Sequence, residues 1–366
     1  MPRKEDSLAH WRSEIDQVDQ EILQLLNRRA RCVGEVGRIK ASAEGAVYVA
    51  SRELDVLDRI ERSNPGPLPG PAVRGVFREV ISASRALQRD LRISYLGPPA
   101  TYTHEAAAYQ FGHAAQYAPA GSIREIFSAV EEGRADFGVI PVESSVAGLM
   151  SQVYDRLLET PLSVSAEVRL SIHHDLLSKS GELGRVRAVY SHPLALDHCQ
   201  KWLDENLPHA AAHATSTTAR AAQFAAVDEN AAAIASSAAA GIYELQVISS
   251  RIEENPMTSF RFWVMGSEPS KPSSRDLTAV LFATEPGEVG SLHGAVGCFA
   301  NHGLNISRFE SCSAGPWRRL YGLECSGHVE EEPMAQALAD LRQRSPFVRV
   351  LGSFARVDRP HDDAKD

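Results

Sequence analysis

Apolar residues recur along the first ninety positions with the spacing of a helix. Steps of three and four residues alternate between Leu8, Trp11, Ile15, Val18, Ile22 and Leu25. Val33, Val36 and Ile39 continue this stripe, which predicts a single helix about 50 Å long at 1.5 Å per residue. A helix of that length cannot bury its apolar stripe alone. We therefore expect a partner chain, with a homodimer as the smallest assembly.

Two shorter helices are predicted after the long one. An amphipathic pattern runs near Ser51–Ser63, and a proline- and glycine-rich run at 64–71 ends it. A third helical pattern then covers about 71–89. Residues 1–90 are therefore predicted to form an all-helical domain.

Strand-like and helix-like patterns alternate over residues 91–268. Short apolar strands are predicted at 92–97, 137–142 and 188–191, with helical patterns between them. This alternation indicates an α/β fold. Its length fits two lobes, with a boundary near 165–172.

A separate pattern begins after a polar linker at 269–275. Residues 276–356 show the order strand, helix, strand, strand, helix, strand, which predicts a ferredoxin-like βαββαβ domain. Residues 357–366 form a polar tail. The expected fold class is thus multidomain, with an all-α domain, a two-lobed α/β domain and a ferredoxin-like domain.

Composition narrows the functional classes. The 366 residues are 43% hydrophobic and 23% charged, and the net charge is −9, which argues against a general nucleic-acid or anionic-membrane binder. The first seven residues lack the apolar segment of a signal peptide, and no apolar run is long enough to span a bilayer. Five scattered cysteines form no CxxC pair. We expect a cytoplasmic protein with no metal and no cofactor.

Basic residues interrupt or flank the stripe of the long helix. Continuing its spacing from Leu25 reaches Arg29, and Lys40 lies one turn beyond Val36. Such side chains can extend along a solvated face. An unpaired charge in a core instead needs an anionic partner. Because Arg12 and Arg52 add to the set, we favour a site for a small anion.

These residues carry a resemblance to a known family. The runs LLNRR (25–29), VGEVGRIK (33–40), SREL (51–54) and SRALQ (84–88) resemble the helical chorismate mutase domain at the front of bifunctional P-proteins. That family rearranges chorismate to prephenate. The reaction needs no nucleophile; it needs a folded dianion, arginines that position its carboxylates, and positive charge at the ether oxygen.

The resemblance implies a role for each matching residue. Two arginines clamp the substrate carboxylates, one of them from the partner chain. Two further side chains bind the ether oxygen, and others complete the cage or bind the ring hydroxyl. The carboxylate clamps are Arg12 from the partner and Arg29. Lys40 and Gln88 bind the ether oxygen, Arg52 and Ser84 complete the cage, and Glu53 binds the ring hydroxyl. Val49 stands where the family often has Asp, which leaves open a chorismate variant such as the 4-amino analogue.

The α/β segment resembles prephenate dehydratase. Five motifs match in order: LGPPATYTH (96–104), VIPVESSVAG (139–148), YSHP (190–193), STTA (216–219) and SFRF (259–262). The family binds prephenate between two lobes. The implied substrate contacts are Thr101, Glu143, Ser144, Ser191, His192, Ser216, Thr217, Thr218, Thr258, Phe260 and Phe262, with Arg261 as a catalytic residue.

Several of these residues also have a purely structural interpretation. The serine–threonine cluster at 216–218 can cap a helix, and His192 before Pro193 can serve a turn. Arg261 lies within an apolar strand pattern, where a guanidinium needs an anion. A substrate carboxylate is the anion we expect.

The departures from the family pattern fall on reactive positions. Phe260 occupies the position of the Thr in the Asn-x-Thr-Arg-Phe motif, which is the family's proposed acid for expelling the ring hydroxyl. Ser144 replaces an Asn, and Leu194 and His198 stand where Gln is common. The framework glycines and prolines are kept. This selective change indicates an altered reaction.

Without an acid at the hydroxyl, prephenate can still lose carbon dioxide if a proton reaches a ring carbon. Non-aromatising prephenate decarboxylases resemble dehydratases and lack the Thr-Arg-Phe motif. We therefore expect a decarboxylase in which Phe260 excludes water from the part of the pocket that holds the ring hydroxyl. The expected proton donor is His198, His104 or Thr258. The alternatives are a dehydratase that uses Thr258 or Ser259 as its acid, and a non-catalytic prephenate-binding regulatory domain.

Residues 276–355 resemble an ACT domain, the phenylalanine sensor of dehydratases. The family's Gly-Ala-Leu-Val and Glu-Ser-Arg-Pro marks read GSLH at 290–293 and ESCS at 310–313. Because the Arg and Pro are absent, we expect weak or no inhibition by phenylalanine.

Overall fold

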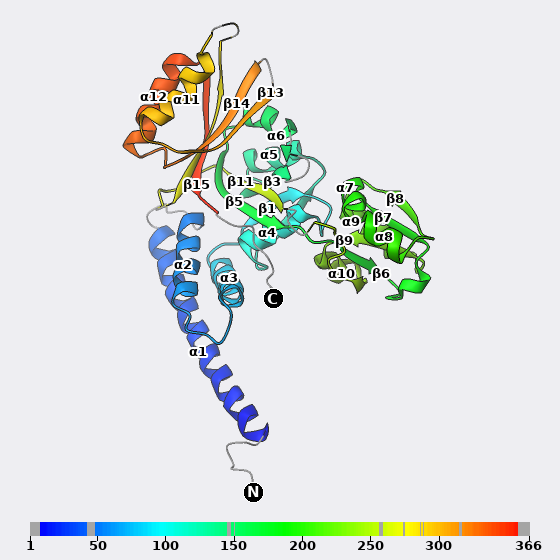
Figure 1. The fold of residues 1–366 in the computed structure, drawn as a ribbon. Coiled ribbons are helices and arrows are strands. Elements are labelled where there is room, and N and C mark those ends of the chain that lie inside the picture. The colour runs from blue at the N-terminus through cyan, green and yellow to red at the C-terminus, as the bar shows by residue number, and fades with distance from the viewer. Residues whose placement is uncertain are drawn as a thin grey trace. The chain divides into compact units, whose positions relative to one another are not determined.

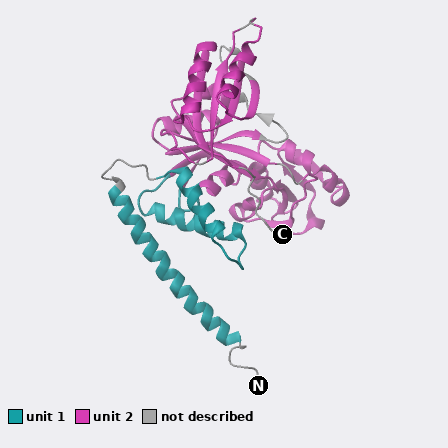
Figure 2. Cartoon of the chain, turned by 60° about the vertical axis from the view of Figure 1, so that its left-hand side comes forward, with its two compact units in different colours: residues 1–91, 111–115 teal, residues 92–110, 116–366 magenta. Residues whose placement is uncertain are grey.

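A computed structural model describes residues 8–41, 48–144, 148–149, 151–255, 259–273, 275–285, 287, 289–314 and 317–357. Lys40, Ser144 and Cys312 have a described backbone only. The chain divides into two units, one of residues 1–91 with 111–115 and one of residues 92–110 with 116–366 (Figure 2).

The first unit contains three helices, as the periodicity predicts. They are α1 (Leu8–Ala41), α2 (Ala50–Arg62) and α3 (Gly70–Ala86). Leu57 of α2 and Ile81 of α3 are buried, and α1 extends well beyond both helices (Figure 1). The first six apolar positions of the α1 stripe stay solvent-exposed in the single chain, from 48% for Ile22 to 68% for Leu8.

The second unit begins with a mixed sheet in the strand order β2-β1-β3-β11-β5, and β4 pairs with β3. β1 is parallel to β2 and β3, whereas β11 is antiparallel to β3 and β5. The elements of this first lobe are β1 (Arg92–Leu96), α4 (Tyr102–Phe111), β2 (Gln116–Ala120), α5 (Ile123–Glu131), β3 (Phe137–Ser144), β4 (Gly148–Leu149), α6 (Ser151–Leu157), β5 (Ser163–Ser171) and β11 (Ser259–Gly266).

The second lobe is a five-stranded sheet inserted between β5 and β11, in the order β10-β6-β9-β7-β8. β7 is parallel to β8 and β9, and β6 is antiparallel to β9 and β10. The elements are β6 (Asp175–Ser178), the 3-10 helix η2 (Leu183–Arg185), β7 (Ala188–Ser191), α7 (Pro193–His198), α8 (Gln200–Asn206), β8 (Ala211–Ala214), α9 (Thr218–Ala225), β9 (Ala231–Ala235), α10 (Ser237–Tyr243) and β10 (Gln246–Ser249). A two-lobed α/β domain, as predicted, follows the helical one.

The last sheet is antiparallel, in the order β13-β14-β12-β15. Its elements are β12 (Asp276–Ala283), α11 (Ser291–Asn301), β13 (Ile306–Ala314), β14 (Trp317–Ser326), α12 (Glu332–Arg344) and β15 (Phe347–Ala355). This is the βαββαβ order that the sequence predicts. Figure 1 shows α11 and α12 side by side on one face of the sheet. Of the helices in the described ranges, none is long and apolar enough to cross a membrane.

β12, one of the two central strands of the last sheet, is buried on both faces. Val280 and Phe282 pack against α11 and α12, whereas Leu277 and Leu281 join a core with Trp263 of the first lobe. This division follows from the alternation of side chains along a strand. The last sheet and the first lobe therefore share one hydrophobic core.

Gly352 of β15 marks a close backbone approach between the last sheet and the first lobe. Its φ is +150°, and a Cβ atom there would lie 2.3 Å from the carbonyl oxygen and 2.8 Å from the amide nitrogen of Val164 in β5. Backbone atoms cannot move aside as a flexible side chain can. Only glycine satisfies both the torsion angle and the space.

We predict that Gly352→Ala lowers the free energy of unfolding by about 2–3 kcal/mol through this clash and the backbone strain. The matched control is Gly297→Ala in α11, where no atom lies within 4 Å of the added Cβ. Alanine there should stabilise by about 0.5–1 kcal/mol, because glycine is a poor helix former. Urea denaturation of both variants measures the difference. Equal effects would contradict the close approach.

Candidate active sites

A cavity of about 250 Å³ lies within the helical unit. Val33 and Val36 of α1 and Ile81 of α3 contribute apolar walls. The residues implied by the mutase resemblance that line it are Arg29, Arg52, Glu53, Ser84 and Gln88. Their assembly from three helices produces a mixed apolar and cationic cavity of the kind that a small cyclic dianion requires.

Arg29 is held in place by α3. Its guanidinium donates to the hydroxyl of Ser84 at 2.7 Å and more weakly to the Val80 carbonyl at 3.4 Å. Ser84 in turn donates to the same carbonyl at 2.6 Å. Burial lowers the pKa of Arg29 from its ordinary value, and the nearby Glu53 carboxylate opposes this shift. The arginine is thus oriented before a ligand arrives.

Arg85 is a cavity residue that the sequence analysis did not single out. Its guanidinium donates to both carboxylate oxygens of Glu53, at 2.7 and 2.9 Å, and lies 5.2 Å from the centre of the Tyr48 ring. The signal was present, because Ile81, Arg85 and Gln88 are spaced by four and three residues on one helix face. Glu53 is therefore an ion-paired cavity residue, and its contact with a ring hydroxyl stays a prediction.

Two residues of the implied set do not line this cavity as described. Arg12 lies on α1 seventeen positions before Arg29, which is about 25 Å along a helix, and its side chain is exposed. The side chain of Lys40 lies outside the described residues. Gln88 donates to the Val33 carbonyl at 2.6 Å, so its side chain is also fixed beside the cavity.

A second cavity, of about 200 Å³, lies between the two lobes of the α/β unit. Residues from β1, α4, β3 and β11 line one side, and residues from α7 and α9 line the other. The predicted contacts found here are Thr101, His192, Ser216, Thr217, Thr218, Phe260 and Phe262. The sequence motifs thus converge on this cavity although they are far apart in the chain.

Several of these residues also begin helices, as their structural interpretation predicts. Thr217 accepts from the Arg220 amide at 3.0 Å as the N-cap of α9. His192 caps α7 by accepting from the Leu194 amide through Nδ1, and Thr101 accepts from the His104 amide at the start of α4. The positive ends of three helices therefore border the cavity, which favours an anion there.

Two predicted contacts and one predicted proton donor do not line this cavity. Ser191 is fully buried and donates to the Ile234 carbonyl at 2.6 Å, so it serves the second sheet rather than a ligand. Glu143 faces an ion-pair network away from the cavity. His104, a predicted proton donor, stacks on Tyr95 at 4.7 Å between ring centres. Thr258 and the side chain of Ser144 lie outside the described residues.

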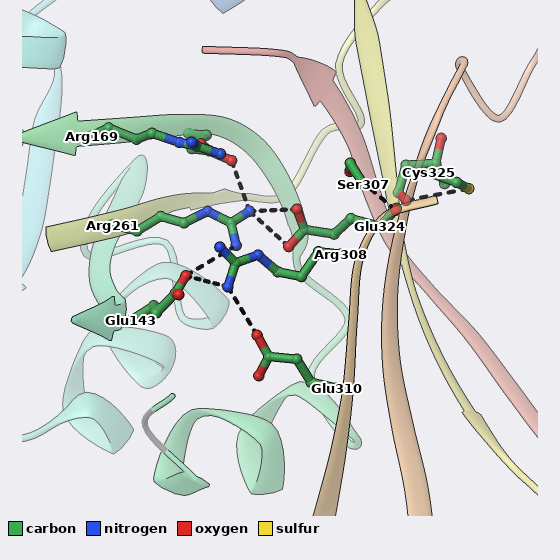
Figure 3. A network of polar contacts seen from close by, with 10 residues as sticks. Glu143, Arg169, Arg261, Ser307, Arg308, Glu310, Glu324 and Cys325 are labelled. Carbon is green, nitrogen blue, oxygen red and sulfur yellow. Dashed lines mark hydrogen bonds and ion pairs between the residues drawn. The ribbon is translucent and has the colours of Figure 1, made fainter. Parts of the chain in front are cut away.

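The position of Arg261 contradicts the prediction that its side chain binds a substrate carboxylate. It lies between Phe260 and Phe262, which face the cavity, so strand alternation turns its side chain to the opposite face. There Arg261, a residue that is 4% exposed, lies with its guanidinium 2.7 Å from Glu324 of β14 (Figure 3). The same guanidinium lies 2.7 Å from Glu167 of β5. The required anions come from the protein itself. Burial alone would lower the pKa of Arg261, but the two carboxylates outweigh burial and raise it.

The network around Arg261 joins the first lobe to the last sheet. Arg308 of β13 contacts Glu143 of β3 at 2.5 Å and Glu310 at 2.9 Å (Figure 3). Arg261 and Glu143 are 3.8 Å apart. The acidic partners therefore belong to β3, β5, β13 and β14. Burial raises the pKa of Glu324, and the neighbouring Glu167 adds to this shift, against the opposing effects of Arg261 and Arg308.

A hydrogen-bonded group of aromatic side chains borders the same cavity and was not predicted as a group. The Tyr102 hydroxyl lies 2.8 Å from Nδ1 of His174, and Nε2 of His174 lies 3.4 Å from Nδ1 of His198. All three side chains line the cavity. Burial lowers the pKa of His174 to about 4, against the opposing effect of Glu253. His174 is therefore a neutral hydrogen-bonding group near pH 7.

Comparisons with known proteins match both segments. The chorismate mutase type II family matches residues 11–89, and the prephenate dehydratase family matches residues 93–270. A bifunctional chorismate mutase/prephenate dehydratase from Aquifex aeolicus is 37% identical over 96% of this chain and 99% of its own.

Solved structures show the same fold. A prephenate dehydratase from Arthrobacter aurescens, in complex with L-Phe, is 29% identical with a TM-score of 0.68, over 75% of this chain and 93% of its own. A quorum-quenching acylase, GqqA, is 25% identical with a TM-score of 0.66, over 73% of this chain and 98% of its own. Because proteins named for different reactions share this fold, the reaction must be argued from the residues of the site.

We predict that Glu324→Ala lowers the free energy of unfolding by about 3–5 kcal/mol, because it removes one of the two carboxylates that lie 2.7 Å from the buried Arg261 guanidinium. Glu310→Ala is the matched control. Its ion pair with Arg308 is about a quarter exposed, so its loss should cost under about 1 kcal/mol. Urea denaturation followed by tryptophan fluorescence compares the two. Similar small losses would show that the Arg261 network does not stabilise the fold.

Proposed function

Because the chain belongs to the bifunctional chorismate mutase/prephenate dehydratase family, we propose that it is an enzyme with two activities. The helical unit converts chorismate to prephenate, and the α/β unit then acts on prephenate. The observation that supports this most directly is that the residues of both matched patterns converge on two cavities, one in each unit.

The mutase activity follows from the charges of the first cavity. Arg29 is pre-oriented by Ser84, so it can position a substrate carboxylate without reorganising. Gln88, and by the family resemblance Lys40, would donate to the ether oxygen that gains negative charge as its bond to carbon breaks. The apolar walls favour the folded conformation of the ring and side chain.

A second copy of the chain would complete this cavity. The exposed apolar stripe of α1 needs a cover, and Arg12 lies too far along the helix to reach the cavity of its own chain. Pairing of two α1 stripes would bury the apolar residues and bring the partner's N-terminal turn toward the cavity. We therefore propose a homodimer, or a higher homo-oligomer, with shared mutase sites.

A mixing experiment tests the shared site. Arg12→Ala and Arg29→Ala homodimers should each lose mutase activity, because each lacks one carboxylate clamp at both cavities. Refolding the two together should recover about a quarter of the wild-type activity, since half of the dimers are mixed and one of their two cavities is intact. If the mixture stays as inactive as its components, Arg12 does not act across chains.

In the second cavity we propose decarboxylation of prephenate without aromatisation. Phe260 lines the cavity at the position of the family's Thr and has no proton to give to the ring hydroxyl. In the proposed reaction the bond between the quaternary ring carbon and its carboxylate breaks, and carbon dioxide leaves. The electron pair forms a double bond to the neighbouring ring carbon, the double bond already at that carbon opens, and its electron pair takes up a proton at its far carbon. The hydroxyl stays.

The alternative is the dehydratase reaction that the relatives' names describe. It would need another acid, such as Thr258 or Ser259, and would release carbon dioxide and water together to give phenylpyruvate. A third possibility is a chorismate mutase whose α/β unit binds prephenate without turnover.

Incubation of the purified protein with chorismate, followed by mass spectrometry without acid treatment, separates the three. Loss of carbon dioxide alone supports the decarboxylase, and loss of carbon dioxide and water establishes the dehydratase. Accumulated prephenate leaves the mutase as the single activity. Acid must be avoided because it aromatises prephenate by itself.

The variant Phe260→Thr tests whether Phe260 determines which product forms. Restoring the hydroxyl should create measurable phenylpyruvate formation in an enzyme that otherwise retains the ring hydroxyl. Phe262→Leu is the matched control, because it changes an aromatic side chain of the same cavity without adding a hydroxyl. Absence of phenylpyruvate in Phe260→Thr would count against Phe260 as the residue that determines the product.

For the last sheet we propose an ACT-like domain with a structural role. Glu310, in the motif that lacks the family's Arg and Pro, is paired with Arg308. Arg308 in turn holds Glu143 of the first lobe. The motif thus contributes to the contact between the sheet and the lobe, which supports stabilisation over phenylalanine sensing.

A further inference from the structure

His198 has one ring nitrogen that the protein does not use. Its Nε2 is buried and has no hydrogen-bond partner among the described residues, and the side chain lines the cavity between the lobes. Its other nitrogen, Nδ1, is directed to His174. An imidazole with one nitrogen anchored and one presented to a cavity is the arrangement of a general acid or base.

We propose that His198 is the acid that protonates the ring carbon of prephenate, and that His174 and Tyr102 are positioning residues that fix its tautomer. This inference rests on the proposed decarboxylation. The imidazolium gives its Nε2 proton to the ring as the carbon–carboxylate bond breaks and carbon dioxide leaves. Solvent water then returns a proton to Nε2.

The hydrogen bonds define which nitrogen carries the proton. The Tyr102 hydroxyl has one proton, and the His173 carbonyl at 3.0 Å can only accept it. We assign the Tyr102 proton to that carbonyl, and in this tautomer the Tyr102 oxygen accepts from Nδ1–H of His174. Neutral His174 is left with a lone pair on Nε2, which accepts from Nδ1–H of His198. The proton that His198 gains or loses is therefore on Nε2, inside the cavity.

The surroundings keep this arrangement in place. Burial lowers the pKa of His174 to about 4, so it remains a neutral acceptor over the range in which an ordinary histidine titrates. Glu253 accepts from the His174 amide at 2.9 Å and pairs with Nδ1 of His173 at 2.7 Å. The segment that carries both histidines is thereby anchored behind the cavity.

His192, the third histidine of the cavity, is less suited to this role. His192 uses Nδ1 to accept from the Leu194 amide, and burial lowers its pKa. It is therefore held as a neutral helix cap. Among the described histidines that line the cavity, His198 alone combines an anchored nitrogen with one that has no partner.

Two departures from the family pattern are joined by this group. Phe260 contacts Tyr102 edge to face, with 5.7 Å between ring centres, and Tyr102 leads through His174 to His198. The hydroxyl is lost at Phe260 and an imidazole is gained at His198 within one contiguous set of side chains. Together the two changes remove a proton donor at position 260 and supply one at position 198. The altered product requires this change, because the proton must reach a ring carbon instead of the ring hydroxyl.

The test uses the full chain with prephenate as substrate and follows the non-aromatic product by mass spectrometry and NMR. His198→Gln, which has a neutral side chain of similar reach, should lower kcat at least about 100-fold with little change in KM. His209→Gln, at an exposed position of the second lobe, is the control and should keep full activity. The circular dichroism spectrum and thermal midpoint of each sample verify that the α/β unit is folded.

Chemical rescue and NMR separate an acid from a structural residue. Added imidazole should partly restore the decarboxylation rate of His198→Ala, whereas sodium chloride at equal ionic strength should not. Tyr102→Phe and His174→Asn should lower kcat about 10-fold or more. They should also alter the ¹⁵N shifts of the His198 ring, which in the wild type should show a proton held on Nδ1 by the contact with His174.

The outcomes distinguish this inference from the proposed function. If the wild type makes phenylpyruvate or leaves prephenate unchanged, the proposed decarboxylation fails and the role of His198 fails with it. If the wild type makes the non-aromatic product but His198→Gln keeps its kcat, only the role of His198 is overturned. Lack of rescue by imidazole, together with normal kcat in Tyr102→Phe, would also overturn it.

Discussion

The α/β unit depends on the alternation of side chains along β11. Phe260 and Phe262 face the cavity between the lobes, while Arg261 between them enters a buried ion-pair network. A shift of β11 by one residue would place the guanidinium in the cavity and an aromatic ring among carboxylates. The ionic network thus fixes the register that builds the cavity wall, and the packing of the last sheet supplies one of its anions.

The sequence predicts the elements better than the partners of their charged residues. Alternating steps of three and four residues identify α1, and the proline-rich run separates α2 from α3. These signals are local. The carboxylates that bind Arg261 lie 94 and 63 residues away, and no spacing along the chain reveals them. The predicted substrate anion was therefore replaced by protein carboxylates.

The candidate sites show the same limit. The motifs place Thr101, His192 and Thr217 at a common cavity because each begins a helix whose position the fold determines. Ser191 belongs to a motif as well, yet it bonds within its sheet. His174 was not predicted, because its hydrogen-bonding partners Tyr102 and His198 approach it only in the folded chain. A residue that acts through others has no signature of its own in one sequence.

The shared core between the last sheet and the first lobe has a consequence for how this chain can change in evolution. A domain joined by a linker alone can be lost, exchanged or duplicated without harm to its neighbour. Here β12 is covered on both faces, and β15 reaches the backbone of β5 at Gly352. Loss of the last sheet would expose the apolar face of the first lobe that it covers. It would also remove Glu324 from the buried Arg261. A role in stabilising the first lobe can therefore preserve the last sheet without any sensing role, because the two share a hydrophobic core and ion pairs.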